Sequence, residues 1–155
     1  MSKIIFNYEG TISIMHPTPE ALQIMTIEQI AEKDLPVGVT TYSIVADSVI
    51  PTDRSFRDSW VGVGIGTTGG TISEDMTKAK ELHKTKIREA RVDKLAALDI
   101  EYQRAIETSA DTSAIVTKKQ ALRDAPAASG IATASNTTEL KAQWDTSILG
   151  TSPYS

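Results

Sequence analysis

The side chains in this sequence that could do chemistry are few, and the two histidines come first. His16 and His83 lie far apart in the chain, and neither has an acidic or histidine neighbour at the spacing of a metal site. A lone His is weak evidence for a ligand or a general base, and His83 falls on the apolar side of a predicted helix. We therefore expect His83 to be a packed or interface residue, and we expect no metal site.

A glycine-rich segment from Gly64 to Gly69 reads Gly-x-Gly-x-x-Gly, the pattern of a dinucleotide-binding turn. That function requires a strand before the glycines and a helix after them, so that the helix N-terminus faces the pyrophosphate. Here Gly70 and the β-prone pair Thr71-Ile72 follow instead. The segment is typical of a glycine-rich strand and turn, so we expect no cofactor.

Other catalytic patterns are missing from the sequence. It contains no cysteine, which excludes disulfides, thiolate metal sites and cysteine nucleophiles. It has no Gly-x-Ser-x-Gly, no phosphate-loop Lys and no His-Glu-x-x-His, and its carboxylates are scattered. We therefore expect that the protein is not an enzyme.

Seven basic residues gather in the middle of the chain and raise the question of nucleic-acid binding. On a helix they point in nearly all directions, and Glu81, Glu89 and Asp93 are interleaved, as in a solvated helix with ion pairs. The whole chain has a net charge of −4, whereas nucleic-acid-binding proteins normally have a clearly basic face. Nucleic acid is therefore an unlikely partner, and a nucleic-acid-binding regulator stays an alternative. The seven residues are Lys78, Lys80, Lys84, Lys86, Arg88, Arg91 and Lys94.

The element that carries these basic residues is a long amphipathic helix predicted from residue 73 to residue 107. Ser73 can cap it, and Glu74 and Asp75 lie where the helix dipole favours negative charge. No Gly or Pro interrupts the segment. At 100° per residue one side is apolar, formed by Met76, Ala79, Ile87, Ala90, Ala97, Leu98, Tyr102 and Ala105, with Leu95 and Ile106 at its edge.

The first half of the chain predicts a small antiparallel β-rich domain over residues 1–73. Two β-rich runs flank Glu9-Gly10, which is a hairpin signal. Thr18 before Pro19 and the capping-box spacing of Thr26 and Gln29 predict one or two short helices over residues 19–33. Residues 40–45 and 61–65 read as strands, and Thr67 to Gly70 as a turn.

The second half predicts a helical hairpin over residues 74–125. Asp111-Thr112 can cap a helix from Ser113 to Asp124, which Pro126 ends. Residues 126–155 read as a linker, a short helix over residues 137–144 and a loose tail. The whole chain is therefore predicted to be α+β, with a β-rich domain, a helical hairpin and a short C-terminal helix.

Several side chains are candidate partner-binding residues, because aromatics and Arg lead the list of interface anchors. Two alternatives stay open. Phe56 and Trp60 could instead fill the core of the β-rich domain, and Leu140 and Trp144 could dock on the chain's own hairpin or on another protein. The candidates are Arg54, Phe56, Arg57, Trp60, Ile87, Leu98, Tyr102, Leu140 and Trp144.

One segment resembles a known group of proteins. Residues 50–60 read Ile-Pro-x-Asp-Arg-x-Phe-Arg-x-x-Trp, and this sequence resembles small proteins encoded in the tail gene modules of tailed bacteriophages. This likeness covers most of residues 45–145, and its central hairpin is also similar in layout to tail-fibre assembly proteins. Further matches are residues 75–80, 87–91, 95–99, 119–126 and 139–144.

The resemblance implies a non-enzymatic protein that binds a phage tail or tail-fibre protein, in the host cytoplasm during assembly, in the virion tail, or in both. It leaves open an assembly chaperone, or a permanent subunit of the fibre, baseplate or neck, and it allows a homo-oligomer. No run of about 20 apolar residues is present, so we expect no membrane association.

Overall fold

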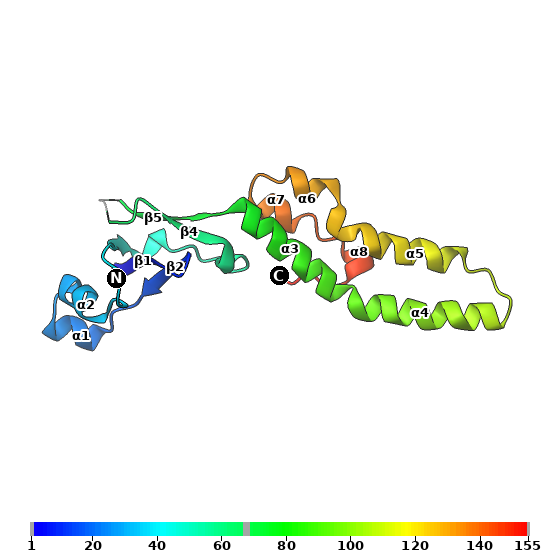
Figure 1. Ribbon diagram of the computed structural model, residues 1–155, viewed down its shortest axis with the longest axis horizontal. Helices are drawn as coiled ribbons and strands as arrows, with labels where there is room; N and C mark the ends of the chain where they lie inside the picture. Colours follow the sequence, from blue (N-terminus) through cyan, green and yellow to red (C-terminus); the bar gives the residue numbers. More distant parts are fainter. Residues whose placement is uncertain (1, 67–68, 155) are drawn as a thin grey trace. The chain divides into compact units, whose positions relative to one another are not determined.

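The computed structural model describes residues 2–66 and 69–154 and separates the chain into two compact units (Figure 1). The first unit is Met1–Asp75 and contains all the strands of the described residues; the second is Met76–Ser155 and is helical. The predicted α+β class is confirmed.

The N-terminal hairpin forms as predicted. Strands β1 (Ser2–Tyr8) and β2 (Thr11–Met15) are antiparallel, with Ile5 opposite Ile14. Glu9 and Gly10 both have positive φ, 49° and 77°, as the two central residues of a type I′ turn do. The right-handed twist of this turn matches the twist of the strands that it joins.

Strand β3 (Ser43–Ala46) pairs with the other edge of β1, so the sheet has the order β2-β1-β3 and is antiparallel throughout. It begins later than the predicted strand over residues 40–45. The predicted helices are confirmed as α1 (Pro19–Ile24) and α2 (Ile27–Asp34), with the Thr18 cap and the capping box both formed.

A second sheet pairs β4 (Trp60–Val63) with β5 (Thr71–Glu74), with Trp60 opposite Glu74. The prediction that the long helix begins at residue 73, with Ser73 as its cap, is therefore wrong, because Ser73 and Glu74 belong to β5 and the helix begins at Met76, directly after Asp75. These residues continue the pairing with the preceding strand, and the Asp75 N–H donates to the Ser59 carbonyl at 2.8 Å. The predicted turn includes residues 67 and 68, which lie outside the described residues.

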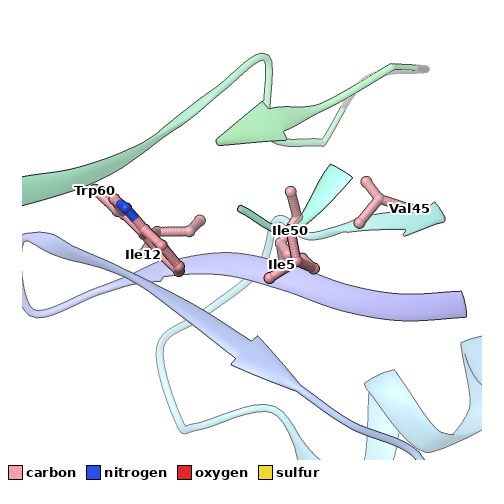
Figure 2. Close-up of a cluster of buried hydrophobic side chains, with 5 residues drawn as sticks. All are labelled: Ile5, Ile12, Val45, Ile50 and Trp60. Carbon is pink, nitrogen blue, oxygen red and sulfur yellow. The ribbon is translucent and has the colours of Figure 1, made fainter. Parts of the chain in front are cut away.

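The first unit has apolar clusters on both faces of β1, because successive side chains of a strand point to opposite faces. On one face Ile4 and Phe6 pack with Ile30 of α2. The other face holds the cluster in Figure 2, which consists of Ile5, Ile12, Val45, Ile50 and Trp60. Both faces of the strand are therefore part of the core.

In the second unit the predicted long helix is divided into α3 (Met76–Ala90) and α4 (Val92–Glu107). Hydrogen bonds run through the bend, from the Arg91 N–H to Ile87 O and from the Leu95 N–H to Arg91 O. Helix α5 (Ser113–Asp124) has the predicted bounds. Helices α4 and α5 contact each other and form a hairpin-like pair of arms (Figure 1).

The segment that was predicted to be a linker is folded. It contains a 3₁₀ turn, Ala125–Ala127, and α6 (Ser129–Thr133), and it buries Pro126, Ile131 and Ala134. The linker prediction is wrong because these few apolar side chains find partners in the helices of the second unit. Contacts of Ala125–Ala127 with α3 and α5 hold the segment in place.

The C-terminal residues are also packed. Helix α7 (Thr137–Lys141) ends before Trp144, earlier than predicted, and α8 (Thr146–Leu149) follows. Leu149 is buried and Tyr154 is half-buried. The predicted loose tail is therefore wrong for residues 146–154.

Candidate protein-docking surface

The α4–α5 arms have little core of their own. None of the sixteen residues of α4 is buried, and Leu122 is the one buried residue of α5. Leu98 and Tyr102, both predicted partner-binding residues, are half-buried. A helix pair of this kind gains little stability from packing, which is the main source of helix stability in proteins.

Polar contacts join the two arms. Lys119 of α5 lies 2.5 Å from the Asp99 carboxylate and 5.0 Å from the centre of the Tyr102 ring. The ammonium group therefore contacts a carboxylate and an aromatic face of α4 at once. These contacts fix how α5 lies against α4, with the Lys119 side chain largely buried and the Asp99 carboxylate exposed.

Large apolar side chains remain exposed on the arms. On α4 they are Val92, Ile100 and Ile106, at 61%, 51% and 55% exposure, and on α5 Val116 is 47% exposed. Single exposed apolar residues are normal, but these four lie on two poorly packed helices, where burial against a partner would be stabilising. We refer to these four side chains as the arm surface.

A groove of about 420 Å³ lies where α8 meets the arms. Its floor is apolar, and two ammonium groups lie beside it. Leu98 is therefore on a surface that a partner can reach. The lining residues are Lys94, Ala97, Leu98, Lys118, Leu122, Ser147 and Ile148.

The predicted partner-binding residues of the first unit include two buried aromatic side chains and two exposed arginines. Phe56 and Trp60 are each 1% exposed and belong to its interior, whereas Arg54 and Arg57 are exposed. The core alternative for the two aromatic residues is therefore what the structure shows. The Ser59 hydroxyl donates to the Phe56 carbonyl at 2.7 Å and fixes the 3₁₀ turn Arg57–Ser59 before β4.

The remaining candidates, Ile87, Leu140 and Trp144, are buried in the second unit. Helix α7, which carries Leu140, contacts α3. The Trp144 indole N–H donates to the Gly150 carbonyl at 3.0 Å. Leu140 and Trp144 therefore dock within their own chain, and in this conformation they offer little surface to another protein.

The structure adds a cluster around His83. The side chain is fully buried, its ring stacks on that of Tyr154 with 5.6 Å between ring centres, and it forms a T-shaped pair with the Trp144 ring at 6.2 Å. His83 Nδ1 lies 2.6 Å from the Tyr154 hydroxyl oxygen, while Nε2 has no hydrogen-bond partner among the described residues. Packing around His83 agrees with the expectation from its apolar position, but nothing in the sequence indicated Tyr154.

The protonation of this cluster follows from its burial. Desolvation, with a smaller effect of the Lys86 charge, lowers the pKa of His83 to about 4, so the imidazole is neutral at pH 7. Burial also raises the pKa of Tyr154. Lys86 and Lys141 lie 5.4 and 5.6 Å from the centre of the Tyr154 ring. A cationic imidazole would therefore be unfavourable here.

Residues 2–66 and 69–154 contain no group of three or more His, Cys, Asp or Glu side chains that could hold a metal ion. In the same residues no helix has the length and apolar character that crossing a membrane requires. No protein-family model, curated protein or solved structure matches this chain.

Proposed function

We propose that this protein is non-enzymatic and acts by binding another protein through the arm surface of α4 and α5. The observation that carries the proposal is a sixteen-residue helix with no buried residue and three exposed large apolar side chains. Covering these side chains would stabilise both the helix and the complex.

The partner that we propose is a tail or tail-fibre protein of a tailed bacteriophage. The support for this partner is the resemblance of residues 50–60, together with shorter matches that lie in α3, α4 and α5. The protein would work in the host cytoplasm during assembly, in the virion tail, or in both.

Co-expression with tail and tail-fibre proteins, followed by a pull-down, tests the proposal. The double variant I100D/I106D should lose the partner, because two carboxylates would replace apolar contacts. The matched control is I24D/V37D, since Ile24 and Val37 are also exposed but lie in the first unit. Equal recovery of the partner by the arm variant and by the wild type would contradict the proposal.

Mass spectrometry of purified virions separates the two structural roles. An assembly chaperone would be absent from the particle, whereas a fibre, baseplate or neck subunit would be present in a fixed ratio to the other tail proteins. Both roles use the same arm surface.

A further inference from the structure

A basic groove lies in the second unit, and none of the four side chains of the arm surface lines it. It has a volume of about 410 Å³ and is bounded by α3, the end of α5 and the segment from residue 126 to residue 132. One wall is cationic, the other is aliphatic, and no carboxylate lines it. The lining residues are Lys84, Arg88, Arg91, Arg123, Pro126, Ala127, Ala128, Ile131 and Ala132.

The fold gathers these cations from two helices. Lys84, Arg88 and Arg91 follow one another at spacings of four and three residues, which places them on one helix face. Arg123 comes from the last turn of α5. The sequence predicted basic residues pointing in nearly all directions, but three of them meet here because the segment after α5 folds back beside α3.

Arg91 is held in place by main-chain oxygens. Its Nη1 donates to Leu122 O at 3.2 Å and to Arg123 O at 2.8 Å, at the C-terminal end of α5. These bonds stabilise the helix end, where the dipole favours a cation. They also fix one guanidinium at the groove before any ligand arrives.

The other cations are not equally available. Lys84 pairs with Glu81 at 2.7 Å, and this contact, with a smaller effect of Arg88, lowers the pKa of Glu81. Within the described chain, the guanidinium groups of Arg88 and Arg123 form no hydrogen bond or ion pair. Arg88 and Arg123 are therefore the groups most open to an anionic ligand.

We propose that the basic groove binds the carboxylates of an acidic, partly apolar peptide segment of a partner protein. This rests on the proposed function, because it assumes that the chain acts through protein contacts. A planar guanidinium pairs well with a carboxylate, and Pro126 and Ile131 offer aliphatic surface to neighbouring side chains of the same peptide.

Charge and lining favour a peptide over a nucleic acid. No aromatic side chain lines the groove, so bases lack the rings on which they usually stack in single-strand-binding proteins. The basic character is also local, since residues 76–155 carry twelve Lys and Arg against ten Asp and Glu, and the whole chain is acidic. Among the described residues, the one carboxylate paired with a lining cation, that of Glu81 on Lys84, would also repel a phosphate backbone.

Titration of the full chain with a short fluorescent peptide of Glu, Leu and Ala tests this proposal by anisotropy at low salt. Binding should be saturable, should weaken as salt rises, and should fall about tenfold or more in R88Q/R123Q. The matched control R104Q/K118Q removes the same charge from exposed side chains that do not line the basic groove. That control should change the affinity by less than about twofold.

Three results would overturn the proposal: no binding of the Glu peptide, equal loss of affinity in both double variants, or equal binding of a peptide with Gln in place of Glu.

Competition with inorganic phosphate and with a single-stranded oligonucleotide gives a further test. Tighter binding of the oligonucleotide would assign the groove to nucleic acid instead. The arm variant I100D/I106D should leave peptide binding unchanged, so failure here is distinct from failure of the proposed function.

Discussion

At the scale of single residues, the burial of a neutral histidine links stability to pH. The pKa of His83 is about 4 in the folded protein and about 6.5 when the chain is unfolded. Between these values the unfolded state binds more protons, so stability falls as the pH decreases from about 6.5 to 4. The full loss is about 3.5 kcal/mol at most, from about 1.4 kcal/mol for each unit of pKa shift.

Urea denaturation, followed by far-UV circular dichroism at several pH values, measures this effect. The variant His83→Gln cannot titrate, so its free energy of unfolding should depend less on pH in that window. Carboxylates also titrate there, but they do so in both proteins and cancel in the comparison. The same pH dependence in the variant and the wild type would show that His83 is not held neutral by burial.

The sequence indicated part of this residue-scale result. The position of His83 on an apolar helix side predicted packing, because helical spacing is a local property. Its stacking partner Tyr154 lies 71 positions away in a segment that reads as a loose tail. Contacts between segments so distant leave no periodic signal in either one.

At the scale of elements, β4 lies so close to the N-terminal hairpin that a side chain in place of Gly62 would have to displace neighbouring side chains. A Cβ on Gly62 would lie 2.7 Å from Ile12 Cδ1 and 2.8 Å from Asn7 Oδ1. The substitution Gly62→Val should therefore destabilise the first unit by about 1–3 kcal/mol, the usual cost of overpacking.

A thermal or urea unfolding curve measures this loss. Ser73→Val, in the strand paired with β4, is a suitable control because Ser73 is exposed and a β-branched residue suits a strand. A Gly62→Val protein as stable as the control would show that β4 does not pack on the hairpin in this way.

Elements defined by local signals were predictable, and those defined by pairing were not. The turn at Glu9-Gly10, the two caps and α5 depend on neighbouring residues. Strand β5 depends on pairing with β4, and because that pairing leaves no signal in residues 71–74, the sequence predicts a helix from Ser73 onward. Likewise, the segment with Ile131 looked like a linker because its few apolar residues are buried only by other helices.

At the scale of the whole molecule, the two units differ in charge as well as in secondary structure. Residues 1–75 carry four Lys and Arg against ten Asp and Glu, while residues 76–155 carry twelve against ten. The first unit therefore has a net charge of −6 and the second a net charge of +2, and the total of −4 hides the slight basic excess of the helical unit. The net charge of the chain could be read from the sequence, but the basic groove could be recognised only from the fold, because its lining residues come from separate segments.

The central claim is that the α4–α5 arms are covered by a partner when the protein works. Hydrogen–deuterium exchange of the free chain and of its complex with the co-expressed tail or tail-fibre protein tests this claim most directly. In the free chain the amides of α4 should exchange quickly, because the helix has no buried side chain. In the complex we expect protection to rise in residues 92–120 and to stay the same in residues 2–66; unchanged exchange in α4 and α5 on binding would contradict the claim.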